Sequence, residues 1–349
     1  MHIDQTVQYL IQVALRYDAT DLHFIPRKKD YIVQIRSGGI NHSIKRLPIP
    51  MMERIISYLK FSSAIDISEK RVPQSGSMNY YINHKEIYLR ISTLPTHLQN
   101  ESIAIRLFHS NRQFSIEKTV VFPHSIQRFL QTVQLNQGLL LLSGPTGSGK
   151  SSTMHMLGEY CSTTFNRRVI TVEDPVEMHN EHFIQVQINE KSGLTYEHAL
   201  KAILRHDPDV ILIGEIRDEN TAKMAIRASL TGHFVIATLH ANHSVGCISR
   251  LLDFNISLVD LQQTIVMISS QRLVQAYCPF CNGKCHMYCQ SLLTKQYAIY
   301  EQLFGQTLEH IMKRYPNGEI KFPVLKDLLR KGIALGYIDE KEFIYEITQ

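Results

Sequence analysis

Hydrophobic and polar positions alternate in short runs along the first 110 residues. A period of two predicts half-buried strands. The runs are Leu22–Pro26, Tyr31–Ser37, Ser77–Asn83, Glu86–Thr93 and Ser102–Phe108. Apolar residues at helical spacing predict helices over 3–15 and 51–61, and the short gap at 83–85 predicts a hairpin. Residues 1–110 are therefore expected to form a mixed α/β domain, a sheet with helices on one face.

The pattern changes after about residue 123, where the apolar runs become continuous. Strands buried on both faces have this pattern, which is typical of parallel sheets. The runs are Leu139–Leu142, Val169–Val172, Val210–Ile213 and Val235–Leu239. Helix-length segments separate them, so residues 124–290 are expected to form a three-layer α/β domain with ligands at the carboxyl ends of its strands. A polar linker is expected at 111–123, and residues 291–349 are mostly helical by pattern.

The first of these runs leads directly into the sequence GPTGSGKSS at 144–152. Glycines permit the dihedral angles and the close approach that a phosphate-binding turn requires. In this pattern the lysine reaches the β- and γ-phosphates, and the next hydroxyl binds Mg²⁺. The expected ATP-binding residues are Gly144, Pro145, Thr146, Gly147, Ser148, Gly149, Lys150, Ser151 and Ser152. Lys150 is also expected to act in catalysis, and ATP and Mg²⁺ are the expected ligands.

Polar residues follow the other continuous runs. Glu215 comes after the run at 210–213, where a strand beside a phosphate loop places an acid next to the metal or the attacking water; a salt-bridged structural acid is the alternative. Three carboxylates in five residues follow the run at 169–172, and they indicate Mg²⁺ binding or activation of water; a solvated acidic loop is the alternative. They are Glu173, Asp174 and Glu177. His240 ends the last run, where it fits a γ-phosphate sensor or a structural histidine.

Four cysteines lie within twelve residues. They are Cys278, Cys281, Cys285 and Cys289. Thiolates at this density predict a closed, structural Zn²⁺ site. The loop between the two pairs is short, so Cys278 and Cys281 are the firmest ligands. A disulfide and unbound thiols on an exposed loop are the alternatives.

Composition and charge narrow the classes of function. The chain has 349 residues, of which 44% are hydrophobic and 20% charged, as expected for a two-domain globular protein. No apolar run approaches the ~18 residues that span a bilayer, and the start lacks the pattern of a secretory signal. Residues 1–120 hold 16 Lys and Arg against 10 Asp and Glu, an excess that favours solubility, or contact with anionic lipid or phosphates. Without dense basic clusters or a basic patch interleaved with aromatic residues, direct DNA binding is not expected.

Four segments of the second domain together resemble the type II/type IV secretion ATPases, the GspE/PilT/PilB family. They match its Walker A (144–151), Asp box (170–177), Walker B (204–218) and His box (231–242). DATDLHF (18–24), RVPQSG (71–76), LRISTLPT (89–96) and ESIAIRL (101–107) match its N-terminal domain. The resemblance covers nearly the whole chain. It implies a PAS-like N-terminal domain, a RecA-like P-loop ATPase domain with a helical C-terminal part, and a six-membered ring.

The resemblance also implies roles for individual residues. Arg90 and Arg106 stand where family members reach the nucleotide phosphates; salt bridges within their own sheet are the alternative. Glu177 and Glu215 match the two key acids, one activating water and one organising Mg²⁺. The matched motifs also contain His233, His240 and Arg217. Ser151 and Ser152 stand where Thr is more usual, and Asn100 where the family tends to have Gly.

Within the family, the chain is similar in length to the compact retraction motors. Its cysteine segment and its ending LKDLLRKGIALGYID (325–339) instead resemble the corresponding segments of assembly ATPases. This combination is similar to the competence ATPases, whose pseudopilus takes up exogenous DNA. The implied partners are a polytopic inner-membrane platform protein and, indirectly, pseudopilins; the implied location is peripheral, on the cytoplasmic face of the membrane. The alternatives are a motor for type II secretion or for pilus extension or retraction, a motor acting directly on DNA, and a non-hydrolysing scaffold.

Overall fold

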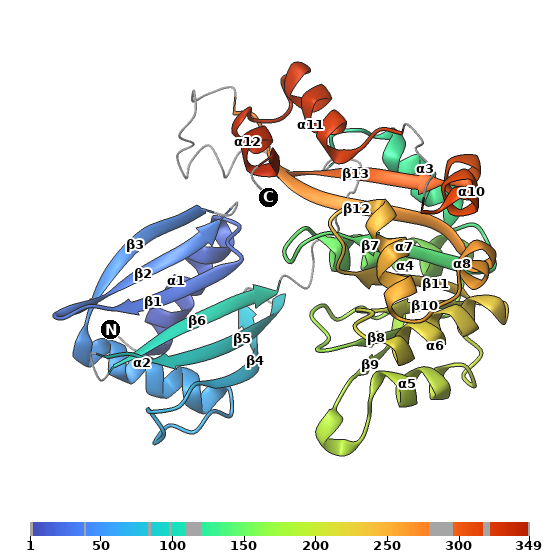
Figure 1. The fold of residues 1–349 in the computed structure, drawn as a ribbon. Coiled ribbons are helices and arrows are strands. Elements are labelled where there is room, and N and C mark those ends of the chain that lie inside the picture. The colour runs from blue at the N-terminus through green and yellow to red at the C-terminus, as the bar shows by residue number, and fades with distance from the viewer. Residues whose placement is uncertain are drawn as a thin grey trace. The chain divides into compact units, whose positions relative to one another are not determined.

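A computed structural model of the chain describes residues 3–37, 40–82, 85–97, 100–108, 120–278, 296–316 and 322–347. The described elements form two compact units (Figure 1). The first unit contains α1 to β6, and the second contains α3 to α12. The predicted linker at 111–123 and the predicted boundary at 290 lie largely outside the described residues.

The first unit is an antiparallel six-stranded sheet in the order β3-β2-β1-β6-β5-β4. Its elements are α1 (Ile3–Arg16), β1 (Asp21–Pro26), β2 (Asp30–Ser37), β3 (Ile40–Pro48), α2 (Ile49–Ser62), β4 (Gln74–Ile82), β5 (Lys85–Pro95) and β6 (Glu101–Phe108). β4 and β5 pair up to Ile82 opposite Lys85, which confirms the predicted hairpin. β3 was not predicted, because its outward positions are polar and most of its side chains are exposed.

The helices α1 and α2 cover one face of this sheet (Figure 1). Alternate strand residues such as Leu22, Ile35 and Ile105 point into the core beneath them. The core also encloses an ion pair: Nζ of Lys60 on α2 lies 2.6 Å from Oε1 of Glu101 on β6, with the two side chains 0% and 3% exposed. Lys60 also donates to the carbonyl of Glu69 at 2.7 Å. The opposite face of the sheet is mixed, with polar residues such as Gln34 and Arg90 beside apolar ones such as Ile32 and Leu94.

The second unit is built around a seven-stranded sheet in the order β13-β12-β7-β11-β10-β8-β9. All neighbours are parallel except β12 and β13. The strands are β7 (Gly138–Ser143), β8 (Val169–Glu173), β9 (Phe183–Gln187), β10 (Val210–Ile213), β11 (Phe234–Leu239), β12 (Ile265–Gln275) and β13 (Gln296–Phe304). The helices are α3 (His124–Thr132), α4 (Lys150–Phe165), α5 (Tyr196–Ile203), α6 (Glu219–Leu230), α7 (Ser244–Asp253), α8 (Leu258–Thr264), α10 (Gly305–Arg314), α11 (Leu325–Ala334) and α12 (Lys341–Ile347), with the short 3₁₀ turn η2 (Glu190–Ser192).

Helices cover both faces of this sheet, which confirms the predicted three layers. Leu139 and Leu141 of β7 join a core with α5, α6, α7, α8 and α10, whereas Leu140 and Leu142 join a core with α3 and α4. Because successive strand residues face opposite sides, a continuously apolar strand feeds both cores. Gly158 lets α4 approach the sheet: a Cβ there would lie 2.7 Å from Cδ1 of Leu212 on β10 and 3.0 Å from Cζ of Phe183 on β9.

Candidate active site

The phosphate loop connects the end of β7 to the start of α4. All six residues of β7 are buried, so the strand holds the loop firmly at the carboxyl edge of the sheet. Gly144, Gly147 and Gly149 have φ values of 140°, 79° and 88°, a region that favours glycine. A Cβ on Gly144 would lie 2.5 Å from the carbonyl oxygen of Gln271 on β12, so the loop is packed against the neighbouring strand.

Lys150 begins α4 and folds back over this loop. Its Nζ donates to the carbonyls of Gly144 at 2.9 Å and Pro145 at 3.0 Å, and its side chain is largely buried. Burial lowers the pKa of Lys150, Glu215 opposes that shift, and Arg272 on β12 adds to it. The ammonium group therefore sits among loop carbonyls and within the electrostatic reach of Glu215.

The loop fits a phosphate chain. A Cβ on Gly147 would have no heavy atom within 4 Å, so open space lies over the turn. The Oγ of Ser148 is buried and makes no hydrogen bond to any described residue, although a buried hydroxyl normally has a partner. The first turn of α4 presents backbone N–H groups and the partly exposed hydroxyls of Ser151 and Ser152. These groups together would hold phosphate oxygens and a Mg²⁺ ion.

Glu215 lies beyond the end of β10 and is held by two side chains. Its Oε2 accepts a hydrogen bond from Nε of Arg217 at 2.6 Å, and its Oε1 lies 3.1 Å from Nε2 of His240. Arg217 also donates to Oδ2 of Asp174 at 3.3 Å. The hydrogen bond to Glu215 is the main cause that raises the pKa of Arg217. The predicted polar residues that follow β8, β10 and β11 thus converge in one polar cluster.

Glu173 is bound into the interior of the unit. Its Oε1 accepts from Thr171 at 2.8 Å, and its Oε2 lies 2.9 Å from Nε2 of His155 on α4. Both Glu173 and His155 are 4% exposed. Asp174 is exposed, and Glu177 is partly exposed and makes no hydrogen bond or ion pair within the described part of the chain. Asp174 and Glu177 are therefore the carboxylates of this segment that solvent can reach.

The structure places His233 away from this cluster. It precedes β11, and its carbonyl accepts from Gly138 at the start of β7, so it lies at the amino edge of the sheet. Six strand residues separate the two edges, a span of about 20 Å. The Nδ1 of His233 instead contacts the carbonyl of Ala228 at 3.1 Å, at the end of α6.

In the first unit, Arg90 and Arg106 stand directly opposite each other on β5 and β6. The cross-strand row continues through Asp21 on β1 to Arg36 on β2. Nε of Arg106 lies 3.0 Å from Oδ1 of Asp21, whereas Arg90 is exposed and has no hydrogen-bonding or ionic partner among the described residues. Like charges placed opposite each other are unfavourable. Arg106 thus makes a salt bridge within its own sheet, which was the alternative for the pair, whereas Arg90 is exposed.

Several residues of the site were not found from the sequence, because β12 was not predicted. Arg272 on this strand donates to the carbonyl of Asn242 at 3.0 Å, so it links the sheet to the loop after His240. Its neighbour Gln271 accepts from Thr153 on α4 at 2.9 Å. β12 carries buried polar residues in its middle, so the apolar run that would have identified it is broken.

Of the predicted zinc ligands, Cys281, Cys285 and Cys289 lie outside the described residues. Cys278 is described and is partly exposed. Among the residues whose placement is described, no group of three or more metal-binding side chains occurs. Nor does any helix in the described ranges combine the length and the apolar character needed to cross a bilayer.

A Gly-rich loop between a buried parallel strand and a helix, with acids beyond strands of the same parallel sheet, defines a P-loop nucleotide-binding domain. The strand that leads to Glu215 was expected directly beside the loop strand, but β11 lies between β10 and β7. The chain belongs to the type II/IV secretion system protein family, whose profile matches residues 1–314.

Relatives of known identity extend across almost the whole chain. Competence protein ComGA of Bacillus subtilis is 41% identical over 348 residues, which cover 98% of this chain and 97% of the relative. The type IV pilus assembly ATPase PilB of Thermus thermophilus is 38% identical over 276 residues, covering 79% of this chain but 31% of the relative. The chain has the same fold as the Legionella pneumophila ATPase DotB, with a TM-score of 0.76 at 18% identity and coverage of 98% and 95%. The likeness confirms the predicted fold class.

Proposed function

We propose that this protein hydrolyses ATP at the carboxyl edge of the second sheet to drive assembly of a type IV-like pseudopilus for the uptake of exogenous DNA. The observation that carries hydrolysis is that Lys150 on the phosphate loop lies within the electrostatic reach of Glu215, which follows β10 of the same sheet. The near full-length identity with ComGA supports the role in competence.

Each group has a defined task in this proposal. Lys150, Ser148 and the backbone N–H groups of the loop hold the phosphates, and the hydroxyl of Ser151 holds Mg²⁺, which neutralises charge on the phosphate oxygens. Glu215 orients water or the metal ion, and His240 and Arg217 fix the direction of its carboxylate. Glu177 is the second key acid, so that one of Glu177 and Glu215 activates water and the other organises Mg²⁺. Asp174, which also contacts Arg217, supplies further negative charge, and Glu173 supports the strand from within through His155.

Arg90 and Arg106 supply positive charge from the first unit. In this proposal the protein works as a ring of six copies, and the two guanidinium groups stabilise the transferred phosphoryl group. The assembly acts peripherally on the cytoplasmic face of the membrane, against a polytopic platform protein. The cysteine segment at 278–289 holds a structural Zn²⁺.

A motor for type II secretion or a type IV pilus is the second candidate, favoured by 36% identity over 284 residues to the type II secretion system protein E of Pseudomonas aeruginosa. A gene deletion scored for DNA uptake, surface pili and protein secretion separates the two. We expect loss of DNA uptake, restored by the wild-type gene and not by the Glu215→Gln gene. Normal uptake with loss of secretion or surface pili would favour the second candidate.

A further inference from the structure

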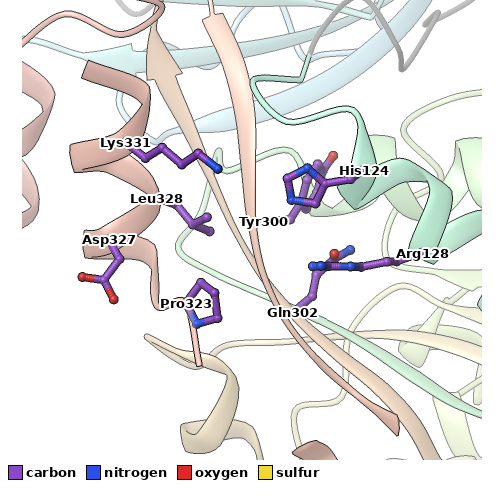
Figure 2. Close-up of a pocket in the computed structure, with 8 residues that line it drawn as sticks. All are labelled: His124, Arg128, Tyr300, Gln302, Pro323, Asp327, Leu328 and Lys331. Atoms are coloured by element: carbon purple, nitrogen blue, oxygen red, sulfur yellow. The ribbon is translucent and has the colours of Figure 1, made fainter. Parts of the chain in front are cut away.

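A cavity of about 170 Å³ lies in the second unit, and no residue of the phosphate loop lines it. Its floor is β13, and α3 and α11 form its walls (Figure 2). His124 and Arg128 enter from α3, Lys331 and Leu328 from α11, and Gln302 from β13. Ligands of drug size occupy about 300 Å³ or more, whereas about 150 Å³ holds a single benzene-sized group. The cavity is therefore the size of one side chain.

Positive charge dominates this cavity. Arg128 stacks on the ring of Phe304 at 5.0 Å, and Nζ of Lys331 lies 5.3 Å from the ring centre of Phe122. Neither cation forms an ion pair with any residue in the described ranges. The one acid of the lining, Asp327, lies 3.9 Å from Arg330 on its own helix. Burial, Arg128 and Lys331 together lower the pKa of His124, so an anion seated among these groups would counter the charge they concentrate.

Gln302 indicates that the ligand also carries a hydrogen-bond donor. Its side chain is 7% exposed, and its Nε2 donates to the carbonyl of Ser125 at 3.0 Å. Its Oε1 is buried and has no hydrogen-bond partner among the described residues. A buried acceptor without a donor is unfavourable, so the ligand should bring an N–H or O–H group. The dianion of a phosphate monoester has no such donor, whereas the backbone N–H of a peptide lies a few bonds from an acidic side chain.

We infer that this cavity receives an acidic side chain of a partner protein: the carboxylate lies between Arg128, Lys331 and His124, and a neighbouring peptide N–H donates to Gln302. Leu328 and Pro323 provide an apolar surface for the methylene groups of the acid. Because the cationic residues are partly or fully exposed, an extended acidic segment can reach them from solvent. No residue of the phosphate loop lines the cavity, so we assign it to docking rather than to hydrolysis. Its lining residue Tyr300 contacts Thr153 of α4 at 3.1 Å, so the ATP turnover of cavity variants is measured as well.

The test uses N-acetyl-glutamate N-methylamide as probe and the matching glutamine compound as neutral control. Binding is followed by the ring signals of His124 in the full chain labelled at histidine, assigned by comparison with His124→Gln. We expect saturable shifts with the glutamate probe and roughly tenfold weaker binding of the glutamine compound, because a charge-assisted hydrogen bond is lost. Arg128→Gln and Lys331→Gln should each weaken binding several-fold. Lys326→Gln, an exposed lysine of α11 outside the cavity, should not.

Three results would overturn the proposal: equal binding of both compounds, no shift of the His124 signals, or tighter binding of inorganic phosphate than of the glutamate probe. ATP turnover of Arg128→Gln and Lys331→Gln, checked for folding by thermal melting, should equal that of the wild type. Loss of turnover in these folded variants would assign the cavity to the nucleotide site instead. The peptide-binding measurements therefore test the docking proposal alone, and the proposed ATP hydrolysis does not depend on their result.

Discussion

Nε2 of His240 lies 3.1 Å from Oε1 of Glu215, although the two residues are 25 positions apart in the sequence. Parallel pairing of β10 with β11, with Ile213 opposite Ala237, brings their strand ends together. Arg217 holds the other oxygen of the same carboxylate. Glu215 is therefore oriented by two groups from different segments. A carboxylate that binds a metal ion or activates water needs such a fixed orientation.

Glu215→Gln should keep ATP binding and lose turnover. The amide is nearly the same size, so the loop remains intact, but it cannot act as a charged ligand or base. We expect turnover to fall by roughly 100-fold or more. Steady-state phosphate release and nucleotide affinity are measured on the same purified protein. Glu219→Gln on the exposed surface of α6 is the control and should leave both values unchanged; near wild-type turnover in Glu215→Gln would contradict the assignment.

Lys150→Ala should abolish turnover while the fold persists. The variant removes the charge that the loop carbonyls hold in place, and stabilisation of developing phosphoryl charge contributes several kcal/mol in such sites. Thermal melting checks the fold and phosphate release checks activity. Lys201→Ala, which removes an exposed helix lysine paired with Glu197, is the matched control. A Lys150→Ala protein that still turns over ATP would rule out this loop as the catalytic site.

Arg90→Ala should lower ATP turnover far more than Arg54→Ala. Both arginines are exposed, but Arg90 belongs to the cross-strand row and Arg54 lies on α2, which covers the other face of the sheet. Turnover should also rise with protein concentration as copies assemble. A chain that begins at Val121 and hydrolyses ATP as fast as the full chain would show that the first unit takes no part.

Lys60→Met should destabilise the first unit strongly. The variant leaves Glu101 buried and without its cation, which costs about 3–5 kcal/mol in comparable pairs. Urea unfolding measures the change. The double variant Lys60→Met/Glu101→Leu should recover most of the loss, because no buried charge remains. Lys201→Met is the control, because it removes the lysine of an exposed ion pair. It should change the free energy of unfolding by about 0.5 kcal/mol or less. An equally small effect at Lys60 would contradict the strong contribution expected of this buried pair.

Protein purified without chelator or affinity nickel should contain close to one zinc ion per chain. The double variant Cys278→Ser/Cys281→Ser should lose it, whereas Cys161→Ala, at a buried and isolated cysteine, should keep it. Metal content is measured by elemental analysis. Metal-free protein of full thermal stability, with four reactive thiols in the segment, would contradict the zinc proposal.

Local patterns were sufficient to predict the parts of the site that follow a buried strand directly. The phosphate loop, Glu215 and His240 all come within two residues of a continuous apolar run, so the sequence indicated both the strand and the polar group after it. His233 shares a motif with His240 but precedes its strand. The direction of the strand places it at the opposite edge, far from the phosphate loop.

Contacts between distant segments could not be predicted in this way. The middle of β12 is polar yet buried, because Ser270 meets Ser143 at 2.5 Å and Gln271 meets Thr153. Such hydrogen bonds allow burial without an apolar pattern. The pairing of Glu173 with His155 likewise depends on how α4 lies across the sheet, which spacing along the chain does not specify.

The close contact at Gly158 packs the helix that follows the phosphate loop tightly against the strand that leads to Glu215. The helix that begins at Lys150 rests directly on Leu212 of the strand that leads to Glu215. A tightly packed interior transmits displacement instead of absorbing it. We therefore expect the phosphate loop and the end of β10 to keep a fixed spacing while ATP binds and is hydrolysed.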